Sequence, residues 1–302
     1  MRRRMPTPTM SASTAVVAPL AAELAGVRAA TGAHRLARLR NGRQGWTATF
    51  GRLAGEDVVL MATGDGPAAA AAGLEALLAA VRPRRLLVVG VAGGLTPGLA
   101  EGTLVAARRV VDAALGRAAQ DPDAPWLDAA LAAGAVAGIV VSADHILASP
   151  AARQTVLRQA LAADEQAAAT VDLESAAYAR VAAAWSLPYL VVRAVLDPAE
   201  EELPLDFEAC RDRSGRVSNA RVVLRALSRP RTLGQLWRLR TRLRAAAARL
   251  GALARRLVAA TPASGGRGEA RGMANVTEMT VTTEAAAQRG DNPAAVAGRR
   301  TA

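Results

Sequence analysis

Three carboxylates in this sequence each follow a short apolar run of strand character. They are Glu23, Glu174 at the start of a helical stretch, and Asp197 at the end of the last such run. A buried carboxyl can hold a proton near neutral pH because burial raises its pKa, and an ionised carboxylate can accept hydrogen bonds or a proton. If the fold brings them together, these side chains can do general acid–base chemistry in one pocket.

Two glycine-rich turns follow other strand-like runs, at Thr63–Gly66 and Gly90–Gly94. Ligands of open α/β sheets lie at the carboxyl ends of strands, so these turns belong beside the carboxylates. Each feature also has a purely structural explanation. Glycines form tight turns, Glu174 complements a helix dipole, Asp197 precedes a proline in a turn, and Glu23 fits the solvated face of a helix.

The elements that must position these residues alternate between strands and helices. Several runs, such as Leu86–Val89, are apolar throughout, which is typical of strands buried on both faces. The alternation predicts an α/β domain with a mixed, mainly parallel sheet. We expect strands at Ala15–Ala18, Thr47–Phe50, Asp57–Ala62, Arg85–Gly90, Gly102–Ala107, Gly138–Ser142 and Tyr189–Leu196. We expect helices at Ala21–Ala30, Pro67–Val81, Ala124–Ala133, Ala151–Ala162, Leu173–Ser186 and Val217–Ser228.

Composition excludes several classes of protein. A chain of 302 residues that is 51% hydrophobic can build a core, which excludes disorder throughout. The single cysteine, Cys210, excludes a disulfide framework and cysteine-based metal sites, and two histidines leave little for any other metal site. We therefore expect no metal and no cofactor. Aromatic residues make up 3%, too few for the stacking platforms of single-strand nucleic-acid binders.

Positive charge is concentrated near the C-terminus. The net charge is +12, yet residues 211–256 alone carry fourteen arginines and one acidic residue, so the remainder is close to neutral. A uniformly basic nucleic-acid binder would not show this distribution. We expect disorder in the arm at 1–13 and in the tail at 261–302, because neither has hydrophobic periodicity.

Residues 229–260 are expected to form an Arg-rich amphipathic helix, with Trp237 beside a leucine stripe. Three interpretations stay open. The helix docks on the domain or on a partner subunit, it lies on an anionic membrane surface between 232 and 260, or it contacts nucleic acid. The stripe consists of Leu236, Leu239, Leu243, Leu250, Leu253 and Leu257.

The N-terminus imitates a signal peptide, with Met1–Arg4 followed by an apolar run. Pro19 interrupts that run and Glu23 ends it, which argues against secretion. The longest uncharged runs are too short and too glycine-rich to span a bilayer. We expect a cytoplasmic protein, soluble or attached at the inner face of the membrane.

Five segments of the chain form a recognisable set: Leu60–Ala69, Val89–Leu95, Gly138–Asp144, Val171–Ala177 and Pro188–Asp197. In order and spacing they resemble the purine nucleoside phosphorylase and methylthioadenosine/adenosylhomocysteine nucleosidase superfamily. The resemblance covers about residues 14–228. It implies a catalytic domain with a three-layer α/β/α fold and a homodimer.

The resemblance also implies cleavage of the N-glycosidic bond to adenine through an oxocarbenium-like sugar. Asp197 would protonate the departing base at N7, Glu174 would bind the ribose 2′ and 3′ hydroxyls, and Glu23 would orient and deprotonate the attacking water. The segment at Ile146 and Leu147 would contact adenine. The other substrate-binding positions are Gly64, Gly66, Val91, Ala92, Gly93, Asp172 and Leu173.

The nucleophile can be argued from the first strand. Phosphorylases of this superfamily hold phosphate with a glycine turn there and with arginines. In this chain Pro19 offers no amide hydrogen, and no arginine lies between it and Arg28. Hydrolysis is therefore favoured. The turn at Gly64–Gly66 opens a helix and could still hold an anion, so phosphorolysis remains the alternative.

Residues 197–199 and 202–204, together with the added helix, resemble the hopanoid-associated branch, which is linked to removal of adenine from adenosylhopane. Two further alternatives stay open: a nucleosidase or phosphorylase of purine and methionine salvage, and a nucleic-acid-binding protein that uses the arginines. Val91 and Leu196 stand where the superfamily commonly has hydroxyl residues. Their apolar side chains put activity on small thio-nucleosides in doubt and would fit a greasy substrate. His145 is expected to pack or face solvent rather than to catalyse.

Overall fold

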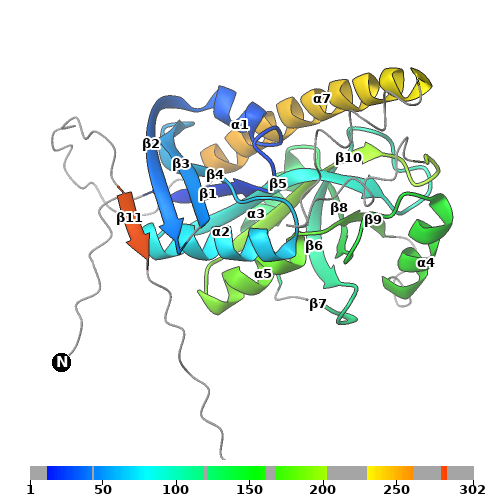
Figure 1. Ribbon diagram of the computed structural model, residues 1–302, viewed down its shortest axis with the longest axis horizontal. Helices are drawn as coiled ribbons and strands as arrows, with labels where there is room; N and C mark the ends of the chain where they lie inside the picture. Colours follow the sequence, from blue (N-terminus) through cyan, green and yellow to red (C-terminus); the bar gives the residue numbers. More distant parts are fainter. Residues whose placement is uncertain are drawn as a thin grey trace, which may run out of the picture.

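The computed structural model describes residues 12–42, 44–118, 121–160, 167–202, 230–260 and 280–283. A twisted mixed sheet lies between two helical layers, with a long C-terminal helix across one of them (Figure 1), which confirms the expected three-layer α/β/α fold. The strands are β1 (Thr14–Ala18), β2 (Gly32–Asn41), β3 (Gln44–Leu53), β4 (Glu56–Ala62), β5 (Arg85–Gly94), β6 (Leu104–Asp112), β7 (Arg117–Ala118), β8 (Val136–Ser142), β9 (Ala168–Asp172), β10 (Tyr189–Asp197) and β11 (Thr280–Thr283). The helices are α1 (Ala25–Ala30), α2 (Pro67–Ala80), α3 (Ala124–Ala132), α4 (Pro150–Ala160), α5 (Ser175–Ala184) and α7 (Pro230–Ala260).

The centre of the sheet is parallel and fully buried. Every residue of β1 is buried, and β1 pairs in parallel with both β4 and β5. Six of the eleven strand pairings within the described ranges are parallel, so the sheet is mixed with a small parallel majority. The continuous apolar runs of the sequence thus correspond to strands covered on both faces.

One half of the sheet closes on itself. β5 pairs with β10, β10 with β6, β6 with β8, β8 with β9, and β9 returns to the end of β5. The last pairing joins Gly93 and Gly94 to Val171 and Thr170. This closure brings the ends of strands that are distant in sequence to the same place.

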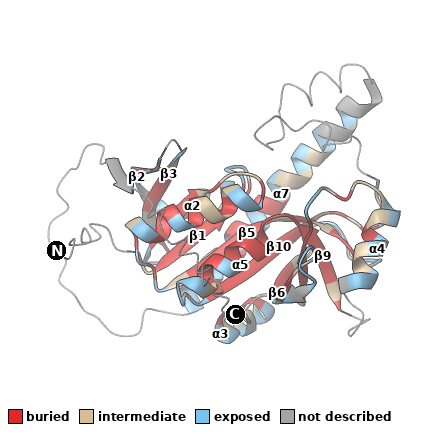
Figure 2. Cartoon of the chain, turned by 60° about the horizontal axis from the view of Figure 1, so that its bottom comes forward, coloured by how far each residue is buried: buried red, intermediate tan, exposed pale blue. Residues whose placement is uncertain are grey.

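Two separate cores hold the layers together. Leu74, Leu77 and Tyr178 of α2 and α5 pack on one face of the sheet, while α1, α3 and α7 pack on the other. Figure 2 shows buried strands between helices whose outer faces are exposed. Local signals fix helix starts: Pro67 occupies the first turn of α2, and the Asp123 carboxylate accepts a hydrogen bond from the Trp126 N–H at the start of α3.

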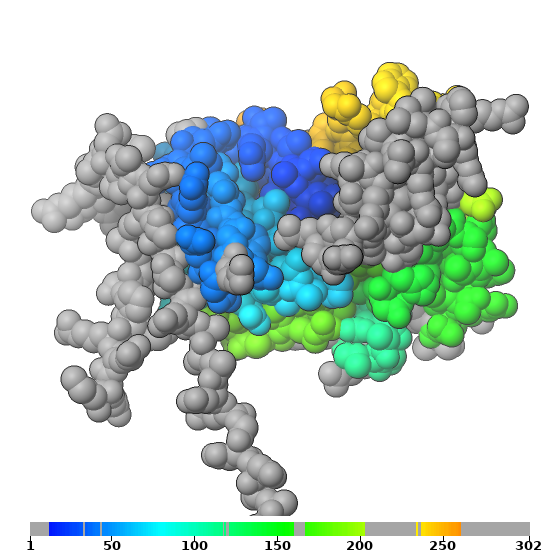
Figure 3. Space-filling model, viewed as in Figure 1, coloured from blue at the N-terminus to red at the C-terminus, as the bar shows by residue number. Residues whose placement is uncertain are grey.

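The C-terminal half of α7 belongs to the core. Leu250, Leu253 and Leu257 are buried against α1, α3 and the strands beneath. The N-terminal half of α7 lies higher above the body of the molecule (Figure 3), and Trp237 in this half is 69% exposed. The side chain of Leu236 lies outside the described residues. No helix in the described part of the chain is long and apolar enough to cross a membrane.

Several expected elements differ from the structure. The strands β2, β7, β9 and β11 were not expected: β2 carries three arginines, which disguise a strand, and β9 spans only five residues. Within the tail expected to be disordered at 261–302, the backbone of Thr280–Thr283 pairs with β2. The helix expected at 217–228 lies outside the described residues, as do residues 1–11 of the expected arm.

Candidate active site

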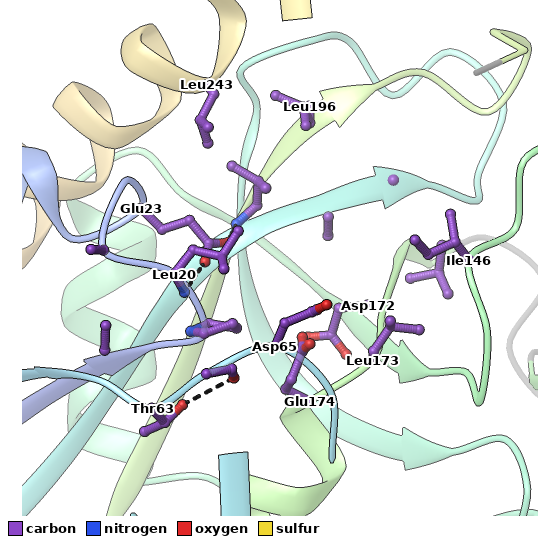
Figure 4. Close-up of a pocket in the computed structure, with 18 of the residues that line it drawn as sticks. Leu20, Glu23, Thr63, Asp65, Ile146, Asp172, Leu173, Glu174, Leu196 and Leu243 are labelled. Atoms are coloured by element: carbon purple, nitrogen blue, oxygen red, sulfur yellow. Dashed lines mark hydrogen bonds between the residues drawn. The ribbon is translucent and has the colours of Figure 1, made fainter. Parts of the chain in front are cut away.

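A cavity of about 910 Å³ opens at the carboxyl ends of the central strands. Glu23, Glu174 and Asp197 all line it, so the structure brings together the three carboxylates that the sequence singled out. Figure 4 shows Glu23 and Glu174 reaching the same space from opposite sides. The cavity can therefore present two or three carboxyl groups to one small ligand.

Strand register explains the convergence. Gly93, near the end of β5, pairs with Asp197 of β10 on one side and with Val171 of β9 on the other. Glu174 follows β9 directly as the N-cap residue of α5. The ring of strands thus places the last residue of β10 and the first turn of α5 around one glycine.

Asp197 is buried and paired with a cation that sequence reasoning missed. Arg153 of α4 forms an ion pair and hydrogen bond with Asp197 Oδ2, and both side chains are almost fully enclosed. Burial raises the pKa of Asp197 above its usual range, and the Arg153 charge opposes that rise. The net direction suits a proton donor near neutral pH.

Glu174 is a second buried acid. Its Oε1 accepts a hydrogen bond of 2.8 Å from the Gly66 N–H at the start of α2. Burial, followed by the nearby charge of Asp172, raises the pKa of Glu174 to about 8. Gly66 itself is absent from the cavity lining. The Gly66 amide serves Glu174, while Gly64 lines the cavity. Substrate binding by Gly66 stays a prediction.

The Asp172 carboxylate takes part in a buried ion pair with Arg193. Arg193 of β10 is fully buried, and its Nη2 lies 2.6 Å from Asp172 Oδ2. Asp172 also accepts hydrogen bonds from the Ser142 hydroxyl, at 2.7 Å, and from Ser175. Asp172 touches the cavity, and its oxygens are engaged by these partners. Its assignment as a substrate ligand stays a prediction.

Glu23 is held by the backbone from two sides. Its Oε2 accepts from the Leu20 N–H and its Oε1 from the Val91 N–H, both at 2.8 Å. Burial raises the pKa of Glu23, while the charge of Arg193 and these hydrogen bonds lower it. The amide of Val91 is thereby used by Glu23, whereas Ala92 and Gly93 remain part of the cavity wall.

The expected base-contacting segment borders the cavity near Arg153 and Asp197. Ile146, Leu147 and Leu173 line it, and Ile146 stands apart from the acids in Figure 4. His145 also reaches the cavity, but its side chain is more than half exposed and its Nδ1 lies 2.5 Å from Asp144 Oδ1. An apolar slot beside a buried acid fits a flat heterocycle.

Helix α7 completes the cavity. Leu239, Arg240 and Leu243 line it. Figure 4 shows Leu243 on the same side as Leu20 and Leu196. Within the helix, Arg242 reaches to the segment that follows Asp197. Its guanidinium pairs with Glu201 at 2.8 Å and with Glu101 at 2.7 Å. The helix therefore forms part of the cavity wall and, through Arg242, contacts the loop that follows Asp197, the candidate proton donor.

Residues 13–228 match the family described as the Phosphorylase superfamily. The chain belongs to the phosphorylase superfamily. This match covers the segment from β1 through all three carboxylates, which confirms the family resemblance seen in the sequence. Helix α7 lies beyond the matched range and contributes residues to the wall of the cavity.

Curated relatives of this phosphorylase-superfamily chain are 5′-methylthioadenosine/S-adenosylhomocysteine nucleosidases. The protein of that name from Shewanella oneidensis is 30% identical over 195 residues, covering 58% of this chain and 80% of the relative. The one from Shewanella sediminis is 28% identical over 194 residues, covering 57% and 82%.

Solved structures share the fold. The nucleosidase of that type from Neisseria meningitidis, in complex with methylthio-immucillin-A, aligns with a TM-score of 0.61 and 21% identity, covering 82% of this chain and 99% of the other. The one from Colwellia psychrerythraea, in complex with adenine, aligns with a TM-score of 0.54 and 23% identity, covering 63% and 84%.

Two site residues escaped prediction, Arg153 and Arg193. Arg193 interrupts the apolar run of β10, and a single arginine within a buried strand is a usable signal for a buried ion pair. Arg153 gives no such signal, because α4 is a polar helix with a second arginine, Arg158. Among the described residues, no group of three His, Cys, Asp or Glu side chains could hold a metal ion.

Proposed function

We propose that this chain hydrolyses the N-glycosidic bond of an adenine nucleoside, and that its substrate is adenosylhopane, from which it releases adenine during hopanoid side-chain biosynthesis. The observation that carries the proposal is the position of Glu23, Glu174 and Asp197 around one cavity. The names of the curated relatives support the adenine nucleoside as substrate class.

The proposed chemistry follows from the geometry. Asp197 gives its proton to N7 of adenine, so that the C1′–N9 bond breaks with a neutral base as leaving group. The sugar becomes an oxocarbenium-like cation. Glu23 takes a proton from water, whose oxygen forms the new bond to C1′. The proton taken up by Glu23 and the one lost by Asp197 are exchanged with solvent, so the enzyme returns to its starting state.

Glu174 grips the ribose hydroxyls in this scheme. Its raised pKa means that it carries a proton near neutral pH when the cavity holds no cation. A positive charge developing on the sugar lowers the pKa of a nearby carboxyl and favours its ionised form. The interaction therefore strengthens as the transition state forms, which is the condition for catalysis.

The lipid part of the proposal rests on the apolar arm of the cavity. Leu20, Leu196, Leu239 and Leu243 lie on the α7 side, away from the carboxylates of Asp172 and Glu174. A nucleoside held by these acids would extend its 5′ substituent along this arm. An apolar 5′ group as large as a hopane is compatible with a wall of leucines, and its transfer from water favours binding.

Attachment to the inner face of an anionic membrane is part of the same proposal. The N-terminal half of α7 exposes Trp237 together with Arg238, Arg240 and Arg244, and Arg240 also lines the cavity. Aromatic and basic side chains on one exposed helix suit a headgroup region. We retain a homodimer as a proposal from the family resemblance. Binding of nucleic acid by the arginines is the non-enzymatic alternative.

Phosphorolysis is the second candidate function, favoured by one observation. Arg28 and Arg240 both line the cavity, so two guanidinium groups are available near the position of the nucleophile. Arginine pairs readily with phosphate. In this version phosphate replaces water at C1′ and the product is a sugar 1-phosphate.

The deciding experiment incubates the full chain with adenosylhopane and, separately, with methylthioadenosine, each with and without phosphate. Mass analysis identifies free adenine and the sugar product. Adenine with a free sugar in the absence of phosphate supports hydrolysis, and a sugar phosphate formed only with phosphate supports the second candidate. Glu174→Gln and Asp197→Asn should each lower adenine release by about 10²-fold or more, whereas no adenine from either substrate contradicts the proposal.

A further inference from the structure

Arg153 joins two parts of the site that are distant in sequence. The side chain is 1% exposed, and its three donor nitrogens reach three different acceptors. Its Nε donates to the Leu147 carbonyl at 3.0 Å, its Nη1 to the Pro198 carbonyl at 2.7 Å, and its Nη2 to Asp197 Oδ2. One guanidinium therefore ties the base-contacting segment after β8 to the end of β10.

The ion pair leaves a defined role for each carboxyl oxygen of Asp197. Oδ2 is held by Arg153, so Oδ1 is the oxygen assigned to proton transfer. The rigid fork of a guanidinium fixes both the position and the plane of a carboxylate, which a single ammonium does not do. Leu196, the residue before the acid, has no hydroxyl that could do this in its place.

We propose that Arg153 is a positioning residue for departure of the base: it holds Asp197 and the segment at Leu147 in one fixed geometry, so that an adenine seated against Leu147 has its N7 opposite Asp197 Oδ1. This inference rests on the proposed function. Arg153 also borders the cavity, but in this proposal it acts on the reaction through Asp197 and Leu147.

The charges around Asp197 determine the sign of the expected pH effect. Arg153 of α4 and Arg242 of α7 lower the pKa of Asp197, while Glu201 and burial raise it. An opposite charge within hydrogen-bonding distance commonly lowers the pKa of a carboxyl by about 1–3 units. Removal of Arg153 should therefore raise the pKa of Asp197 by that amount and make it a weaker acid.

The first test follows Asp197 directly and needs no activity. The full chain is labelled with ¹³C at aspartate carboxyls, and the Asp197 signal is identified by its loss in Asp197→Asn. We expect its titration midpoint to rise by about 1–3 pH units in Arg153→Met. Arg158→Met removes an exposed arginine from the same helix and should leave the midpoint unchanged. An unchanged midpoint in Arg153→Met overturns the proposal.

The second test separates positioning of the acid from general damage. We expect Arg153→Met to lower kcat for adenine release about tenfold or more, while turnover of 4-nitrophenyl riboside, whose leaving group needs no proton, stays near wild type. Equal losses on both substrates overturn the proposal. If the wild-type chain releases no adenine, the proposed function fails and the titration still decides the role of Arg153.

A variant that keeps the charge covers the case in which Arg153→Met does not fold. Lysine cannot reach three acceptors at once, so Arg153→Lys should move the Asp197 midpoint less than methionine does and still lower kcat for adenine release. Wild-type kcat in Arg153→Lys contradicts the proposed positioning by the guanidinium fork.

Discussion

Gly251 of α7 lies directly against Gly26 of α1: a Cβ atom on Gly251 would stand 2.4 Å from the Gly26 carbonyl carbon. Gly26 follows Glu23 by three residues, so the two helices cross just beyond the segment that carries this carboxylate. Helix α7 is therefore packed by backbone contact against α1, beside the wall of the cavity. Larger residues at the crossing would separate the two helices.

Gly251→Ala should destabilise the protein. Alanine normally favours a helix over glycine by about 1 kcal/mol, but here its methyl group overlaps backbone atoms that can move only if α7 shifts. We expect the free energy of unfolding in urea to fall by about 1–3 kcal/mol. Gly234→Ala on the same helix is the control, since among the described residues no atom outside its own helix turn lies within 4 Å of its added Cβ. A Gly251→Ala protein as stable as Gly234→Ala would show that α7 is not held at this crossing.

Ionisation of Glu174 should lower the free energy of unfolding as the pH rises. Its pKa is raised from 4.5 to about 8, so between these values the folded state binds the proton more tightly than the unfolded state. The stabilisation is complete below about pH 4.5 and is lost as pH rises towards 8.

Glu174→Gln removes that dependence. We expect the difference in free energy of unfolding, Glu174→Gln minus wild type, to increase from pH 5 to pH 8 by on the order of a few kcal/mol. Denaturant titrations at several pH values measure the difference. Glu75→Gln, an exposed position on α2, is the matched control and should run parallel to wild type. Parallel curves for Glu174→Gln as well would mean that Glu174 ionises normally.

Trp237 should contribute to membrane binding. Because Leu250 and Leu253 of the same helix are core residues, deletion of α7 would damage the fold, and a point variant is the cleaner probe. We expect Trp237→Ser to weaken co-sedimentation with anionic vesicles by about tenfold, since burial of a large apolar side chain is worth about 1.5–3 kcal/mol. Trp185→Ser, at the end of α5 on the opposite layer, should bind as wild type does. Equal vesicle binding by both variants would exclude this surface.

Leu243 should help to select the 5′ substituent. It lines the apolar arm from α7, so Leu243→Trp narrows the arm without touching the acids. We expect kcat/KM to fall about tenfold or more for adenosylhopane and to change little for methylthioadenosine. Ala252→Trp, on the exposed face of α7, is the control. A similar loss on both substrates would place the 5′ group elsewhere.

Sequence patterns revealed the strands whose apolar residues run without interruption, because burial on both faces leaves a one-dimensional signal. β5 and β10 are examples. Sequence patterns did not reveal β2, whose strand carries three arginines among its apolar residues, or the four-residue β11. Pairing partners of such strands are contributed by distant segments, so their own residues carry little information.

For the site, the sequence by itself determined which carboxylates follow strands and which family the chain resembles. Only the tertiary structure decided that Glu23, Glu174 and Asp197 share one cavity. Strand register around Gly93 brings Asp197 and Glu174 together, and the Val91 amide on the same strand holds Glu23. The tertiary structure also decided that Asp172 is committed to Arg193 and that Arg153 holds Asp197. Ion pairs between residues 21 and 44 positions apart depend on the packing of separate elements, and local sequence contains no record of that packing.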